Sequence, residues 1–337
     1  MGNAMDDEVV TPSQAVYPEP LPRVWRTLIG RHEVVVFTLV LIISVFLSLR
    51  TDTFFTWSNL SNISRAFSWI AIAAFGESMV IIIGGIDLSV GAVMALAGLI
   101  SALCLHHGFP EPLAVIAGIL TGGLVGWVNG TMVGRVRLPP FIVTLGTMSI
   151  TRGIAFGLTG GWPVRNLPQG FRALGQYDLQ IGFMSLPLPV IFMLGLAFLT
   201  SLLMGKTVLG SYIYTLASSE RALLVSGVNV MQIKALVYTL CGALTAIGGV
   251  LMTARLGVAA PTAALGYELD IIAAAVIGGT SLSGGEGSIL GVLLGAAVMQ
   301  MLRTGLVLLG FSAYWQTAAL GTMILAFILL DHWRRLS

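Results

Sequence analysis

The feature that most constrains this chain is a series of apolar stretches, each long enough to cross a lipid bilayer and almost free of charged side chains. A transmembrane α-helix needs about 20 predominantly apolar residues. Stretches of this kind occupy residues 34–49, 66–83, 88–106, 113–133, 186–204, 233–254, 288–309 and 314–330. Only 9% of the 337 residues are charged, whereas soluble domains carry about a quarter. A water-soluble fold is therefore excluded.

Two further candidate spans are shorter or interrupted by polar residues. Residues 140–159 contain Arg152 and follow a pair of prolines, and residues 268–280 begin with two acidic side chains. Counting both, the sequence predicts an all-α polytopic membrane protein with about ten transmembrane helices, or eight at a conservative count.

The distribution of lysine and arginine predicts the orientation of the spans. Cytoplasmic loops carry an excess of these residues, and the excess arises here when both termini are placed inside. We expect a loose cytoplasmic tail over residues 1–33, which lacks the apolar core of a signal peptide. A transmembrane domain over 34–331 and a cytoplasmic end over 332–337 follow. The sizeable loops are 160–185 on the outside and 205–232 on the inside.

Glycine recurs at every fourth position along the span at 113–133. Small residues at this spacing let the backbone of a neighbouring helix approach closely. We therefore assign a helix-packing role, in preference to a binding role, to Gly118, Gly122, Gly126, Gly130 and Gly134.

A nine-residue pattern occurs twice between apolar spans. Residues 83–91 read IGGIDLSVG and residues 277–285 read IGGTSLSGG, so both fit I-G-G-x-x-L-S-x-G. Transporters are often built from internal repeats with their sites at broken helices, and a break in a membrane must be buried in protein or border water. The pattern predicts two related halves, parallel or inverted, with two glycine-rich helix breaks. The candidate gating residues are Gly84, Gly85, Asp87, Ser89, Gly278, Gly279, Ser281 and Ser283.

Asp87 is an acid inside the first of these breaks. A carboxylate there can cap a helix beginning near Leu88, where the helix dipole favours an anion. Acids within membrane spans are also functional candidates, so direct contact with a substrate is the alternative. We prefer the capping interpretation.

Motifs for chemistry on this chain are missing from the sequence. The segment GKT at 205–207 lacks the glycine that a nucleotide-binding loop requires, because Thr200 stands at that position. The histidines and cysteines show no metal-ligand spacing. We expect that the chain is not an enzyme and that it binds no cofactor, metal ion or nucleic acid.

Four stretches of the sequence carry a resemblance to a known family. They are GGIDLSVGAVMALAG (84–98), NGTMVGRVRLPPFIVTLGTMSITRG (129–153), ARLGVAAPTAALGYELDIIAAAVIGGTSLSGGEGSILG (254–291) and GFSAYWQTAALGTMILAFILLD (310–331). From about residue 60 onward the chain resembles the permease subunits of ATP-binding cassette (ABC) importers for sugars, of the ribose and xylose type. The resemblance implies a multi-pass protein of the inner membrane that translocates a monosaccharide.

The same resemblance implies the partners. Such permeases work as a homodimer or heterodimer with cytoplasmic ATPases, and a periplasmic sugar-binding protein delivers the substrate. We expect that protein to dock on 160–185 and 255–267.

The inside loop 205–232 matches the region through which the family couples to its ATPase. It reads YTLASSERALLVSGVNV over 214–230 and lacks the usual glycine- and asparagine-rich lead-in and the pair of alanines. The coupling candidates are Ser219, Glu220, Arg221, Ala222, Leu223 and Gly227. We expect apolar contacts with the ATPase from Leu216, Ala217, Leu223, Leu224 and Val228.

Two other functions compete with sugar import by an ABC transporter. An ion-coupled secondary carrier would use Glu77, Asp87, Arg152 and Arg303 as coupling residues. An ABC permease for branched-chain amino acids or nucleosides would share the glycine-rich layout. The segments GGIDLSVG and YELDIIAAAVIGGTSLSGG favour sugars, but the sequence does not name the sugar.

Overall fold

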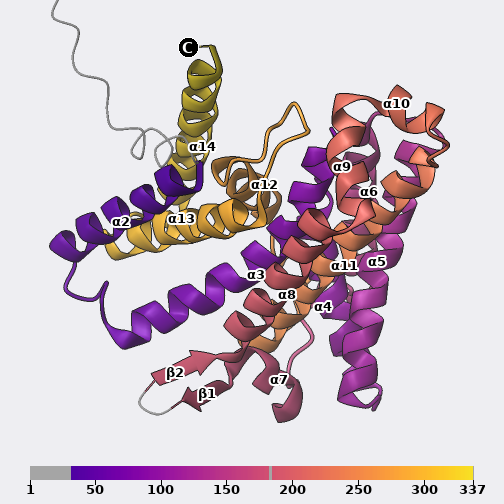
Figure 1. Ribbon diagram of the computed structural model, residues 1–337. Coiled ribbons are helices and arrows are strands. Elements are labelled where there is room, and N and C mark those ends of the chain that lie inside the picture. Colours follow the sequence, from indigo (N-terminus) through magenta and orange to yellow (C-terminus); the bar gives the residue numbers. More distant parts are fainter. Residues whose placement is uncertain (1–31, 182–183, 337) are drawn as a thin grey trace, which may run out of the picture.

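A computed structural model describes residues 32–181 and 184–336, and most of these residues are helical (Figure 1). The long helices are α2 (His32–Arg50), α3 (Trp57–Ile82), α4 (Val90–His106), α5 (Glu111–Gly134), α6 (Pro140–Thr159), α8 (Leu188–Lys206), α11 (Val230–Leu256), α13 (Ile289–Leu308) and α14 (Ala313–Leu336). The shorter helices are α7 (Gln169–Gln176), α9 (Val208–Ser218), α10 (Glu220–Val225) and α12 (Tyr267–Ile277).

The predicted all-α membrane fold is confirmed. Within the described part of the chain, 7 helices are long and apolar enough to cross a membrane, namely α2, α3, α5, α6, α8, α11 and α13. The shorter helix α4 is also apolar. Each predicted span falls on a helix, and the interrupted span at 140–159 coincides with α6. Of the predicted tail, only His32 and Glu33 lie within the described residues, and they already belong to α2.

The loop 160–185, which was predicted to lie outside, has more structure than the sequence indicated. It contains α7 and the first strand of a hairpin, in which β1 (Asp178–Ile181) pairs antiparallel with β2 (Met184–Pro187). The hairpin and α7 lie at one end of the molecule, whereas α10 lies at the other (Figure 1). The chain therefore presents a different small folded element at each end of the helical bundle.

Local sequence explains where several helices begin. The hydroxyl groups of Thr56, Ser219 and Ser288 accept backbone N–H groups in the first turns of α3, α10 and α13. These are preferred N-cap residues because they satisfy amides that have no partner within the helix. Helices α5, α6 and α8 instead carry proline in the first turn, where its missing N–H costs nothing.

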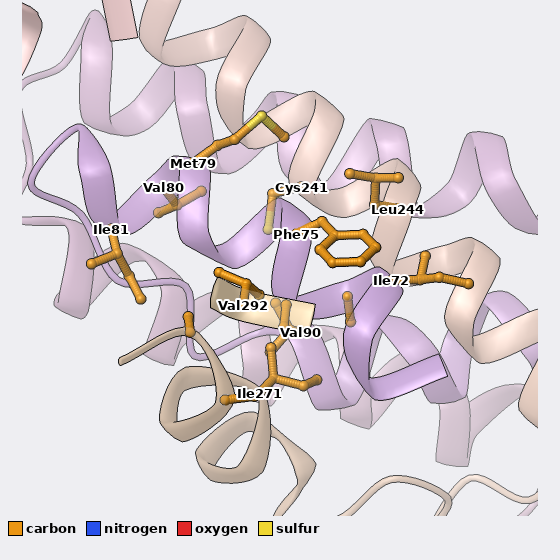
Figure 2. Close-up of a cluster of buried hydrophobic side chains, with 14 of the residues drawn as sticks. Ile72, Phe75, Met79, Val80, Ile81, Val90, Cys241, Leu244, Ile271 and Val292 are labelled. Atoms are coloured by element: carbon orange, nitrogen blue, oxygen red, sulfur yellow. The ribbon is translucent and has the colours of Figure 1, made fainter. Parts of the chain in front are cut away.

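Helix α3 is the centre of the fold. In its most apolar stretch 89% of the residues are buried, whereas the corresponding shares are 11% in α2 and 22% in α6. Figure 2 shows Phe75 and Met79 of α3 in one apolar cluster with Leu244 of α11, Ile271 of α12 and Val292 of α13. In contrast, α2 and α6 leave large apolar side chains exposed, which suits contact with lipid or with another subunit.

The four-residue glycine series of α5 lies mainly against α11. A Cβ atom on Gly122 or Gly126 would overlap a backbone carbonyl oxygen of α11, and one on Gly130 would lie 2.6 Å from the Cα of Ala235. Gly118 instead faces α4 at Ser101, and Gly134 faces the carbonyl of Met231 at 3.0 Å. Their hydrogen side chains permit the close approach of backbones that the spacing predicted.

Alanine at Gly126 should therefore destabilise the protein. The added methyl group forces α5 and α11 apart, and overpacking of this kind costs about 1–3 kcal/mol. The measurement is the thermal unfolding temperature of the purified protein in detergent. Gly123→Ala on the same helix is the matched control, because its Cβ would meet only a methyl group of Thr239 at 4.0 Å. Equal melting temperatures for the two variants would contradict the packing role.

Candidate functional site

The first I-G-G-x-x-L-S-x-G segment ends α3 with a left-handed turn. Gly84 has φ +81°, a conformation that favours glycine. The amides of Gly84 and Gly85 donate to the carbonyls of Ile81 and Val80, at 2.9 Å each. Orphan carbonyls at the end of the helix are satisfied in this way. The chain then runs without helical structure until α4 begins at Val90.

The second segment ends α12 in the same way, but one residue later along the motif. Here the second glycine, Gly279, is left-handed with φ +94°. The amides of Gly279 and Thr280 donate to Val276 and Ala275 at 2.9 Å and 3.0 Å. The two breaks therefore share one geometry, although the sequence pattern pairs Gly84 with Gly278 and the conformation pairs Gly84 with Gly279.

The two breaks lie against each other. The amide of Gly285, in the loop after α12, donates to the carbonyl of Ile82 at 2.9 Å. A Cβ on Gly284 would lie 2.9 Å from that same carbonyl oxygen. Ser281, also in the loop, donates its amide to the carbonyl of Glu286 at 3.0 Å, and Ser283 donates its amide to the Ser281 hydroxyl at 3.3 Å. The compact loop of the second break thus seats on the last turn of α3.

A buried polar network surrounds the first break. The carboxylate of Asp87 accepts the amide of Ser89 at 2.8 Å and its hydroxyl, and Asp87 donates its own amide to Glu77 at 3.0 Å. The side-chain amide of Asn129 donates to Asp87 at 3.3 Å and to Ser89 at 3.0 Å. All four residues are at most 2% exposed. Asp87 therefore binds a backbone amide freed by the break and is shielded from solvent in this conformation.

The predicted start of α4 was slightly wrong. We expected the helix to begin near Leu88 with Asp87 as its cap, whereas it begins at Val90 and its N-cap residue is Ser89. Sequence reasoning also missed Asn129 and Thr144, whose hydroxyl donates to the carbonyl of Ile86 at 3.1 Å. Polar side chains in otherwise apolar spans were the available signal for both.

A cavity of about 660 Å³ borders the first break. Its lining comes from four parts of the chain, namely the break itself, the α5–α6 connection, α10 and α11: Ile83, Gly84, Gly85, Val133, Arg137, Leu138, Pro139, Pro140, Glu220, Arg221, Leu224, Lys234 and Tyr238. Two predicted gating residues and two predicted coupling residues therefore meet at one hollow. A Cβ on Gly85 would overlap the hydroxyl of Tyr238.

Helix α9 joins the predicted coupling region to the second break. The hydroxyl of Tyr214 donates to the carbonyl of Gly287 at 2.8 Å, and burial raises the pKa of this phenol above its ordinary value. A Cβ on Gly284 would lie 2.7 Å from that of Ala217. Helix α9 thus contacts the second break directly, whereas α10 borders the cavity beside the first.

The predicted apolar contacts of this region separate into two groups. Leu216 and Leu223 are buried within the chain, and Ala217 and Val228 are half-buried, so these residues attach α9 and α10 to the bundle. Leu224 is 52% exposed. Val225, which the sequence analysis did not select, is 83% exposed. The remaining candidates, Ser219, Glu220, Arg221, Ala222 and Gly227, are exposed.

The start of α2 clasps both ends of the second break. The ring nitrogen Nε2 of His32 lies 2.9 Å from the carbonyl of Ile277, which ends α12. The hydroxyl of Ser288, which caps α13, donates to the carboxylate of Glu33 at 2.8 Å. A Cβ on Gly279 would lie 2.5 Å from the His32 ring. The start of α2 therefore packs against this break and bonds to both of its ends.

Of the residues proposed for an ion-coupled carrier, Glu77 and Asp87 lie together, whereas Arg152 and Arg303 make their contacts elsewhere. Arg303 pairs with Asp270 and lies over the ring of Tyr267. Arg152 donates to the carbonyls of Pro261 and Ala263 at 2.8 Å each. Glu77 belongs to the network around Asp87. Over residues 32–181 and 184–336, no group of three or more His, Cys, Asp or Glu side chains is placed to hold a metal ion.

Comparison with known proteins assigns the family. Residues 59–328 match the family described as "Branched-chain amino acid transport system / permease component". The chain belongs to this family, and within it to the permease subunits of ribose/xylose-type sugar ABC importers. Such subunits are transport components and not enzymes, and they work in the membrane with an ATPase and a periplasmic binding protein.

The relatives are sugar permeases. The chain is 40% identical to the ribose import permease protein RbsC of Escherichia coli (strain K12), over 87% of this chain and 91% of the relative. RbsC of Bacillus subtilis (strain 168) is 39% identical, over 86% and 89%. The D-allose transport system permease protein AlsC of Escherichia coli (strain K12) is 36% identical, over 88% and 90%. The search of solved structures found no significant match to this chain.

Replacing Asn129 by alanine should destabilise the polar network around the first break. The change removes a donor from the buried carboxylate of Asp87, and an unsatisfied buried group costs about 1–3 kcal/mol. We expect a lower thermal unfolding temperature in detergent. Thr121→Ala on the same helix is the control, since its hydroxyl bonds only to the carbonyl of Ala117 one turn away. A larger loss for Thr121→Ala would contradict the importance of the network.

Proposed function

We propose that this chain is the membrane-spanning subunit of an ATP-driven importer that takes up a monosaccharide of the ribose kind. The observation that carries the proposal is the 40% identity with a ribose import permease over 87% of this chain. The relatives named as D-allose and fructose permeases each match 88% of this chain. The geometry adds a physical connection between the region near α10 and both helix breaks.

The proposed mechanism follows the contacts between α9, α10 and the breaks. An ATPase binds the exposed surface of α10 around Leu224 and Val225 and displaces α9 and α10 as it closes. The bond from Tyr214 to Gly287 passes this displacement to the loop of the second break. The bond from Gly285 to Ile82 passes it on to the end of α3. The glycine turns act as hinges beside a water-filled path.

The orientation follows from the same assignment. If α10 faces the cytoplasm, both termini do so too, and α7 with the hairpin faces the outside. Arg65 pairs with Asp178 at the start of β1. Arg255 donates to Asn62 at 2.9 Å, and Gln176 donates to the carbonyl of Arg255 at 2.9 Å. These bonds fix the hairpin and α7 on the bundle as a platform for a sugar-binding protein.

The pathway needs a second permease copy, identical or related. Helix α6 carries many exposed apolar side chains and lies beside the cavity through Pro140. In the proposed dimer, the two copies enclose the path between them. The sugar is selected mainly by the binding protein, and we assign no residue of this chain to recognition of a particular sugar.

Leucine at Gly85 or at Gly279 should abolish sugar uptake without preventing membrane insertion. The larger side chain would meet Tyr238 in the first case and the His32 ring in the second, so each hinge would be fixed or distorted. Uptake of labelled ribose and the amount of protein in isolated membranes are the measurements. Gly195→Leu is the control, because a Cβ there meets no atom within 4 Å. Normal uptake by both hinge variants would remove the gating role.

The energy source separates the proposed function from an ion-coupled carrier. The chain is reconstituted into vesicles with its ATPase and sugar-binding protein, and ribose uptake is followed. We expect uptake to require ATP and the binding protein and to ignore an imposed ion gradient. Uptake driven by the gradient alone, in the absence of ATP, would refute the proposal.

A further inference from the structure

The cavity beside the first break carries cations that a neutral sugar does not require. Arg137, Arg221 and Lys234 line it, with Glu220 as the acid in the lining. Lys234 pairs with Glu220 at 3.0 Å. The guanidinium groups of Arg137 and Arg221 have no ion-pair partner among residues 32–181 and 184–336. Two positive charges therefore border one hollow without a counter-charge.

The backbone at Arg137 is unusual. Its φ is +61°, and a non-glycine residue in the left-handed region is uncommon. Arg137 lies in the short connection between α5 and α6, between Val136 and Leu138, which are 56% and 42% exposed. Residues held in sparsely populated conformations cluster at functional sites.

An unpartnered hydroxyl lies in the same lining. Tyr238 is fully buried, and its hydroxyl oxygen has no hydrogen-bond partner in the described structure. Buried polar groups are normally satisfied, so this hydroxyl is an unsatisfied donor beside the cavity. The cavity thus combines two free guanidinium groups, one ammonium group and one free hydroxyl from three parts of the chain.

We propose that this cavity binds a phosphate group. Arginine guanidinium groups recognise phosphate oxygens through paired, charge-assisted hydrogen bonds, and a volume of about 660 Å³ lies within the range of small-molecule sites. The phosphate belongs either to a free sugar phosphate in the cytoplasm or to the head group of an anionic lipid, since basic pockets on the cytoplasmic side of membrane helices bind such head groups. A sugar phosphate is the ligand that we favour, because the cavity is built mostly from polar residues and glycine on its break and α10 sides.

The ligand would regulate uptake, and this part rests on the proposed function. A phosphate held by Arg137 and Arg221 bridges the α5–α6 connection to α10, next to Gly84 and Gly85. It thereby opposes the displacement of α10 and of the first break. Accumulated sugar phosphate would slow further import.

Binding is tested without transport, so its outcome is independent of the importer assignment. The full chain is placed in phosphatidylcholine nanodiscs and titrated calorimetrically with ribose 5-phosphate, inorganic phosphate and ribose. We expect both phosphates to bind, and ribose alone not to bind this site. Arg137→Gln and Arg221→Gln should each weaken phosphate binding about tenfold or more, as expected for the loss of a charge-assisted pair. Tyr238→Phe should weaken it less and leaves the charge unchanged.

The matched control is Arg135→Gln. Arg135 is an exposed cation two residues before Arg137 and lines a different hollow, next to Gln232. It should leave phosphate affinity unchanged, and all variants should unfold at the wild-type temperature. Equal weakening by Arg135→Gln and Arg137→Gln would show a general surface charge effect and overturn the site.

A second arm separates the two sources of phosphate. If the free phosphates do not bind, the unfolding temperature is compared between discs with and without phosphatidylglycerol. Stabilisation by this lipid that disappears in Arg137→Gln and Arg221→Gln would keep the site and assign it to a lipid. Absence of both effects would refute it. In reconstituted vesicles, ribose 5-phosphate on the cytoplasmic side should slow uptake by wild type and Arg135→Gln, but not by Arg137→Gln.

Discussion

A helix that stops within a packed apolar bundle leaves backbone amides and carbonyls without partners, and apolar side chains supply none. This chain contains two such ends, and it satisfies one partly with the other, through the bond from the Gly285 amide to the Ile82 carbonyl. The remaining polar groups of the first break are met by Asp87, Asn129 and Thr144 from three different segments. The breaks therefore form a single polar unit. The surrounding helices enclose the first break, whereas the loop of the second is exposed at Leu282, Ser283 and Glu286.

The cost of this arrangement is the burial of two carboxyl groups. The carboxylate of Glu77 accepts the backbone amide of Asp87, and both residues are almost completely shielded from solvent. No cation among the described residues pairs with either of them. Burying acids without a cation is expensive. Such groups persist where they serve more than packing, and here they fix the backbone at the point where α3 ends and α4 begins.

The sequence predicted the helices well because membrane spans depend on composition and length alone. Residues 140–159 coincide with α6 despite Arg152, whose guanidinium reaches two backbone carbonyls. The repeated glycine pattern predicted both breaks, but it could not show that they touch, because contacts between distant segments leave no local signal. Asn129 did carry a local signal, a polar side chain in an apolar span, which the sequence analysis did not use. The exposure of Val225 depends on how α10 packs on the bundle. The packing of Leu216 and Leu223 inside the chain likewise follows from the fold of α9 and α10 on the bundle.

The clasp between α2 and the second break has a practical and biological consequence. His32 and Glu33 contact Ile277 and Ser288, which lie 245 and 255 residues further along the sequence. Under the proposed mechanism, an affinity tag or a fluorescent protein joined ahead of His32 is attached through these bonds to a break that moves during transport. A load held at the start of α2 would then change how easily the second break moves.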